Sequence, residues 1–98
     1  KASSESLTHA MIYECSAATH AVIHIHNLNL WNRLIHQVPT SREKIPYGTP
    51  EMAHEIKRLF EETALNKEKI IVMGGHPEGI ISFGKDLEEA GSILIDKL

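Results

Sequence analysis

The amino-acid sequence predicts a single α/β domain, in which a small mixed or antiparallel sheet is flanked by layers of helices. Two observations lead to this prediction. Short runs rich in valine and isoleucine alternate along the chain with longer stretches of helical periodicity. The chain has 98 residues, which suits one domain rather than two. The predicted order is a helix, a strand, two helices, two strands and a final helix.

The first half of the chain contains four predicted segments. Residues 4–18 are expected to form a helix, because apolar side chains recur loosely and no proline interrupts them. Residues 20–26 follow as a strand, since three of the seven are β-branched. A short helix is expected over residues 27–35. Residues 39–47 contain two prolines and several charged side chains, and we interpret them as a loop.

The second half begins with the clearest helix in the sequence. Thr49 is a favourable N-cap and Pro50 suits the first helical position. An apolar stripe follows, so we expect the helix to run to about Leu65. The remaining predicted elements are two strands and a final helix, over residues 70–73, 80–83 and 86–97. Asp86 is interpreted as the N-cap of that last helix rather than as part of a hydrolytic carboxylate pair.

Composition and charge exclude several classes of function. The formal net charge of -3 leaves no basic surface for nucleic acid. No stretch approaches the roughly 20 apolar residues of a membrane span, and no secretory signal precedes the first helix. Cys15 is the single cysteine, so no disulfide within the chain is possible. We therefore expect a cytoplasmic protein without nucleic-acid or membrane partners.

Two histidines on one predicted strand are the first candidate metal ligands. His24 and His26 are two residues apart, and alternate side chains of a strand point to the same face. Two imidazoles side by side offer what a divalent ion needs from neighbouring ligands. The alternative is a pair of solvated histidines on an exposed strand face.

Further candidates lie in a turn and at the start of the first helix. His76 sits in a Gly-Gly-His-Pro-Glu-Gly turn directly after a buried strand, where sites of α/β proteins commonly lie; the alternative is a polar turn with an incidental histidine. Glu5 lies in the first helical turn, where the helix dipole alone would favour an acid. Ser3 and Ser4, with the N–H groups of the helix start, can bind an anion such as phosphate.

Together these pieces resemble the class II aldolase/adducin family in four blocks that cover nearly the whole chain. Ala2 stands where the first block of the family usually has proline. The 19-residue step from Glu5 to His24 also fits the family. The blocks are Ser3-Ser4-Glu5 with His9, Ile12 and Tyr13; residues 21–26 (AVIHIH); residues 47–52 (YGTPEM); and residues 75–84 (GHPEGIISFG).

The resemblance implies a fold and a set of roles. It implies a layered α/β/α domain of the class II aldolase type, with residues 1–98 as the C-terminal portion of the family fold. The metal, most simply zinc, is held by the three histidines, although imidazole also suits cobalt, nickel and iron. Glu5 acts as the acid/base, and the two serines bind substrate phosphate. The ion acts as a Lewis acid for the enediolate formed when a carbon–carbon bond breaks.

The implied function is that of a divalent-metal-dependent aldolase, a carbon–carbon lyase acting on a sugar or sugar phosphate. The family also implies a homo-oligomer, typically a tetramer. Three alternatives stay open on the sequence. The first is a non-catalytic metal-binding or assembly domain derived from the family. The second is an enzyme similar to methylthioribulose-phosphate dehydratase, and the third is a soluble α/β domain whose histidines are merely solvated.

Overall fold

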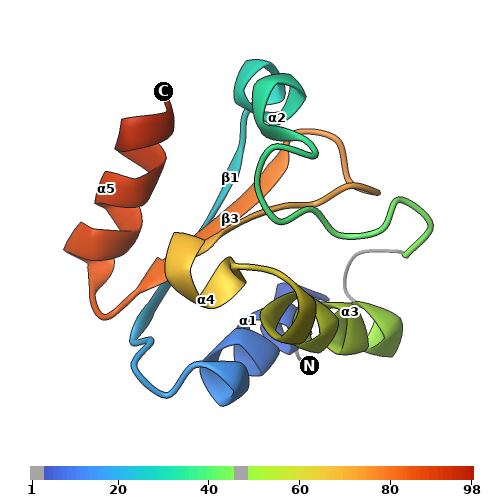
Figure 1. The fold of residues 1–98 in the computed structure, drawn as a ribbon, viewed down its shortest axis with the longest axis vertical. Coiled ribbons are helices and arrows are strands. Elements are labelled where there is room, and N and C mark those ends of the chain that lie inside the picture. Colours follow the sequence, from blue (N-terminus) through green and yellow to red (C-terminus); the bar gives the residue numbers. More distant parts are fainter. Residues whose placement is uncertain (1–3, 46–48) are drawn as a thin grey trace.

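The computed structural model describes residues 4–45 and 49–98, with side chains from Thr8 onward (Figure 1). The described strands form one antiparallel sheet in the order β1-β3-β2. The strands are β1 (Ala21–His26), β2 (Ile70–Val72) and β3 (Gly79–Gly84). The helices are α1 (Ser4–Cys15), α2 (Leu28–Leu34), α3 (Pro50–Glu62), α4 (Leu65–Glu68) and α5 (Leu87–Lys97). The predicted α/β class, with a small antiparallel sheet flanked by helices, is confirmed.

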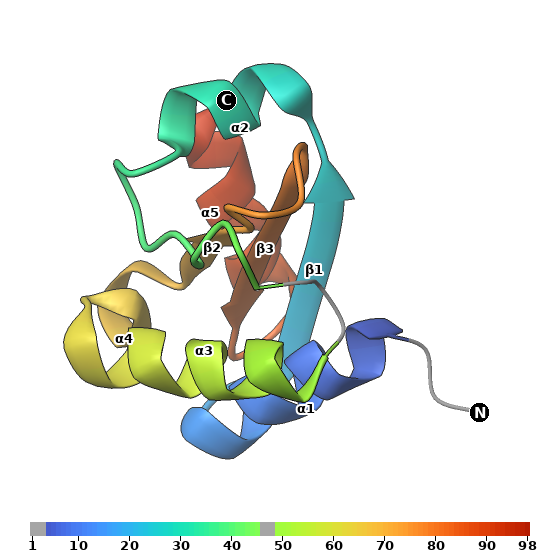
Figure 2. The same ribbon diagram turned by 90° about the vertical axis from the view of Figure 1, so that its right-hand side faces the viewer.

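Helices cover both faces of the sheet, because its strands carry apolar side chains on both. Helices α1 and α3 run side by side on one face, and α5 packs on the other, as the two ribbon views show (Figures 1 and 2). The core on the α1 and α3 face consists of Ile12, Met52, Ile56, Leu59, Leu65, Ile71, Met73, Ile81 and Phe83. The core on the α5 and α2 face consists of Leu30, Leu34, Val38, Ile70, Val72, Ile80 and Leu94.

Three helices begin at side-chain caps. The Thr49 hydroxyl accepts from the backbone N–H of Met52, and Pro50 occupies the first turn of α3. Asn27 caps α2 through the N–H of Leu30 at 2.9 Å. Asp86 caps α5 at 2.8 Å, which confirms the interpretation of this acid as a cap. Each cap satisfies a backbone donor that the helix itself leaves without a partner.

The prediction that the α3 helix continues to about Leu65 is wrong, because the helix is interrupted before that residue. The helix ends at Glu62, and Thr63 takes an extended conformation with φ of -129°. Its hydroxyl donates to the Leu59 carbonyl oxygen and accepts from the N–H of Leu65. A threonine side chain that bonds to nearby backbone competes with the helical ladder. The short helix α4 then begins, and it is absent from the predicted order.

The segment before residue 46, predicted as a loop, also extends the sheet. Thr40 forms a parallel bridge with Val72. The N–H of Val72 donates to the Pro39 carbonyl oxygen, and that of Ser41 donates to the Val72 carbonyl oxygen, each at 2.9 Å. This segment therefore covers the outer edge of β2, which would otherwise expose unpaired backbone groups.

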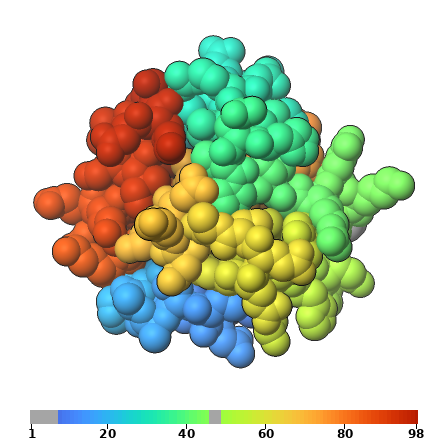
Figure 3. All heavy atoms as spheres, viewed as in Figure 1, coloured from blue at the N-terminus to red at the C-terminus, as the bar shows by residue number. Residues whose placement is uncertain are grey.

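With all atoms drawn, helices and the segment between α2 and α3 hide most of the sheet from one side (Figure 3). The Cα radius of gyration is 12.0 Å, close to the ~13 Å of a 100-residue domain. Among the described helices, none has both the length and the apolar character that crossing a bilayer demands.

Candidate metal centre

Strand β1 brings two imidazoles together on one face of the sheet. His24 and His26 alternate with Ile23 and Ile25, which pack into the α5 and α2 core. The histidines therefore point to the opposite face, toward α1 and α3. Their ring centroids are 4.8 Å apart. The predicted shared face of the two histidines is what the structure shows.

The third imidazole comes from the tight turn between β2 and β3. The N–H of His76 donates to the Met73 carbonyl oxygen at 3.0 Å, and the N–H of Gly79 donates back to the His76 carbonyl oxygen at 2.9 Å. The N–H of Asn27, just after β1, donates to the carbonyl oxygen of Glu78 at 2.9 Å. This last bond ties the histidine-bearing end of β1 to the turn that carries His76.

The strand register then completes the cluster. The His76 ring centroid lies 6.2 Å from that of His24 and 5.4 Å from that of His26. His26 pairs directly with Gly79 on β3. A Cβ at Gly79 would come within 2.6 Å of the His76 Cδ2 atom. The glycine therefore leaves the space opposite His26 that the third ring occupies.

The donor set suits a divalent transition metal. One ring nitrogen from each histidine can be chosen so that all three lie within 4.8 Å of one another. Ligands of a tetrahedral zinc ion lie about 3.4 Å apart, given zinc–nitrogen distances of about 2.1 Å. The three nitrogens would therefore have to move closer together to hold such an ion. Three protein ligands leave a fourth position for substrate or water, as in catalytic zinc sites.

Two further side chains hold the turn from outside the cluster. The indole Nε1–H of Trp31 on α2 donates to the Met73 carbonyl oxygen at 3.0 Å. The backbone N–H of Gly74 donates to the buried Ser41 hydroxyl at 2.9 Å. A Cβ at Gly74 would lie 2.0 Å from the Ser41 carbonyl oxygen, so the two backbones meet in direct contact. Sequence reasoning missed both contacts, because each joins residues far apart in the chain.

The predicted substrate-side residues are only partly within the described structure. Ser4 and Glu5 form the start of α1, and the description of this region extends to their backbone alone. Ser3 lies outside the described residues, as do Tyr47 and Gly48 of the third family block. The roles of Glu5, Ser3 and Ser4 therefore stay predictions, whereas the three histidines are brought together.

Three imidazoles thus come together on a layered α/β domain, in an arrangement that could hold a divalent metal ion. The family model described as Class II Aldolase and Adducin N-terminal domain matches residues 1–95. The chain belongs to this family. No individual curated protein matches it. Proteins of the family generally depend on divalent metals, bind sugar phosphates and form oligomers.

Proposed function

We propose that the protein is a divalent-metal-dependent lyase that cleaves a carbon–carbon bond in a sugar or sugar phosphate. The observation that supports this proposal best is the convergence of His24, His26 and His76 on one sheet face. A merely structural zinc site would more commonly use four protein ligands and close the coordination shell. Three ligands with room for a fourth are what a substrate-binding metal needs.

Three histidines, one glutamate and two serines have proposed roles in this chemistry. The three imidazoles would hold the ion, most simply zinc. When bound, the ion supplies a Lewis acid for negative charge that develops on substrate oxygens. Glu5 moves a proton to or from the reacting substrate, which a nearby carboxylate can do. Ser4, the first residue of α1, and Ser3 before it in the sequence bind the phosphate of the substrate with help from backbone N–H groups.

We also propose that the protein acts as a homo-oligomer. Strand β1 lies at one edge of the described sheet, where β3 is its one neighbour among the described strands. Edge strands are commonly covered by another element or another chain. Size-exclusion chromatography with light scattering measures the assembly directly, and a strictly monomeric protein at micromolar concentration would remove this part of the proposal.

Metal analysis combined with turnover tests the main proposal. The purified protein should contain one divalent ion per chain and release a carbonyl product from at least one member of a panel of sugar phosphates. His24→Ala should lose both properties, because two imidazoles no longer form a complete three-ligand site. His54→Ala is the matched control, since His54 is exposed on α3 and lies outside the cluster.

The outcomes separate the candidate functions. Metal at full occupancy without turnover on any panel member would exclude the lyase and favour a metal-binding assembly domain. Loss of water rather than carbon–carbon cleavage would identify a dehydratase. Protein that binds no divalent ion under any condition would contradict the metal centre itself.

A further inference from the structure

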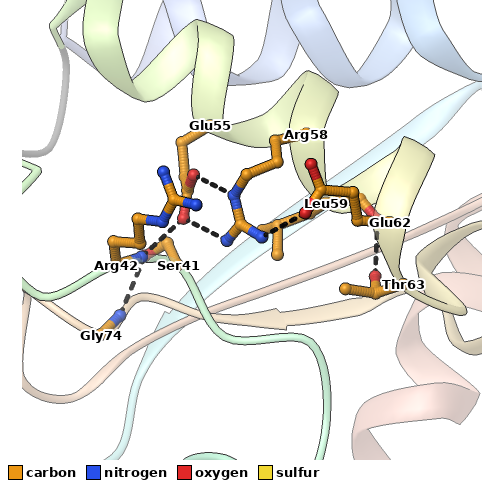
Figure 4. A network of polar contacts seen from close by, with 8 residues as sticks. All are labelled: Ser41, Arg42, Glu55, Arg58, Leu59, Glu62, Thr63 and Gly74. Carbon is orange, nitrogen blue, oxygen red and sulfur yellow. Dashed lines mark hydrogen bonds and ion pairs between the residues drawn. The ribbon is translucent and has the colours of Figure 1, made fainter.

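Helix α3 carries a buried carboxylate, Glu55, that is not one of the three clustered histidines. Glu55 is only 3 % exposed, because it lies on the same face of α3 as the core residues Met52, Ile56 and Leu59. A carboxylate in such a position needs partners for both oxygens, because burying an unpaired charge is very costly. Figure 4 shows that Glu55 has them.

Two groups satisfy the Glu55 carboxylate. The Arg58 guanidinium donates from Nε to Oε1 at 2.6 Å and from Nη2 to Oε2 at 2.7 Å. The backbone N–H of Arg42 donates to Oε2 at 2.7 Å. Burial opposes ionisation most strongly, but the hydrogen bonds from Arg58 and Arg42, with their charges, lower the pKa of Glu55 below its ordinary value. The carboxylate is therefore ionised at neutral pH.

The contact with Arg42 links this ion pair to the turn that carries His76. Ser41, the residue before Arg42, accepts the N–H of Gly74 on its hydroxyl, and its own N–H donates to the Val72 carbonyl oxygen. Gly74 and Gly75 would each bring a Cβ within 2.3 Å of a carbonyl oxygen of this segment. The segment thus packs against the two glycines that precede His76, and Figure 4 shows its bond to the first of them, Gly74.

We propose that Glu55 is a positioning residue of the metal centre, acting through the Arg42 amide and Ser41 on the His76 turn. This inference rests on the proposed function only in requiring a divalent ion at the three histidines. A buried ion pair contributes little net stability compared with apolar packing. The hydrogen bonds of Glu55 are directional, however, and they fix the position of the segment that packs against the His76 turn. A fixed turn keeps the His76 imidazole close enough to the other two imidazoles to share an ion with them. Partners beyond the ligands commonly tune metal affinity in this way.

Cobalt(II) titration of the full chain tests the proposal, because tetrahedral cobalt gives a visible absorption spectrum that reports ligand geometry. Glu55→Gln keeps the size of the side chain but removes the charge that holds Arg58. It should weaken cobalt affinity by about tenfold or more and alter the visible spectrum. Ser41→Ala, which removes only the hydroxyl that accepts from Gly74, should change both in the same direction and keeps the test valid if Glu55→Gln fails to fold.

Ile56→Val is the matched control, because Ile56 is fully buried next to Glu55 and is outside the hydrogen-bonded network. It should lower the melting temperature of the metal-free protein while leaving cobalt affinity and spectrum as in the wild type. Wild-type affinity and spectrum in both Glu55→Gln and Ser41→Ala would overturn the positioning role alone. Failure of the wild-type chain to bind cobalt would overturn the positioning role together with the metal centre.

Discussion

At the scale of single residues, the proposed metal centre depends on a glycine, because a larger residue would fill the space that the His76 ring needs. Gly79 faces His26 across the β1–β3 ladder, and the ring of His76 lies over the position that a Cβ would take. A larger residue here would compete with the imidazole for the same volume. Since protein interiors are close-packed, one added methyl group in such a place is felt.

Gly79→Ala should therefore weaken metal binding as well as lower stability. The added Cβ would stand 2.6 Å from His76 Cδ2, and the imidazole would have to rotate away from the shared position. We expect metal affinity to fall by about tenfold or more, with a loss of about 1–3 kcal/mol in unfolding free energy from overpacking. Isothermal titration with zinc and urea unfolding measure the two effects. Unchanged zinc affinity would show that the His76 ring does not need this space.

Sequence reasoning found the three histidines but not the residues that place them. The shared face of His24 and His26 follows from the strand period of two, which needs no knowledge of the fold. The role of Gly79 depends on strand register, which one strand alone does not reveal. Glu55 left a signal that could have been used: it interrupts the apolar stripe of α3 at an inward position, with Arg58 one turn later.

At the scale of elements, α5 and the metal centre lie on opposite faces of the sheet. Leu94 of α5 belongs to the same core as Ile80 and Val72, whereas the histidines lie on the other face of β1. Changes in α5 should therefore alter stability without altering the metal site. Gly91 offers a suitable position, because a Cβ there meets no atom within 4 Å apart from its chain neighbours and the backbone of its own helix.

Gly91→Ala should stabilise the fold. Glycine inside a helix costs about 0.5–1 kcal/mol relative to alanine, so the melting temperature should rise by about 2–8 °C. Zinc affinity should equal that of the wild type, which makes this variant a glycine-to-alanine control for the change at residue 79. Differential scanning calorimetry of the metal-free protein checks the stability, and a lower melting temperature would contradict the open environment of Gly91.

Most helices and strands could be predicted from the sequence. The predictions failed where tertiary or side-chain contacts outweigh the local preference for a helix or a loop. Caps at Thr49 and Asp86 gave two helix starts, because the capping oxygen is within the segment itself; the cap at Asn27 was not predicted. The break at Thr63 was missed, since helical periodicity continues through it. The Thr40–Val72 bridge was missed as well, because a strand contact made by one residue leaves no period in the sequence.

At the scale of the whole molecule, we expect folding and metal binding to be linked. The ligands come from β1 and from the turn before β3, so only the folded chain brings them together. A ligand that binds only the folded state stabilises it by mass action, by about 2.7 kcal/mol at a concentration 100 times its dissociation constant. Chelators should accordingly lower the melting temperature of the metal-loaded protein.

Thermal unfolding with and without zinc tests this linkage. At 100 times the dissociation constant, zinc should raise the melting temperature by roughly 10–20 °C, and EDTA should reverse the effect. His76→Ala should melt at the same temperature with and without zinc. Trp31, the single tryptophan, bonds to the turn that carries His76 and provides a fluorescence signal for both unfolding and binding. A zinc-dependent shift in His76→Ala as large as in the wild type would place the ion elsewhere.

The pairing of β1 with β3 also determines when β1 can fold during synthesis of the chain. Strand β1 is made before β3, its one neighbour in the described sheet, and three helices and β2 are made between the two. Long-range pairings form late, and strands that wait for them are prone to self-association. The two histidines interrupt the β-branched run of β1 with polar rings, as gatekeeper residues do in aggregation-prone segments. The future metal ligands would thus protect the strand during synthesis, before the third imidazole exists.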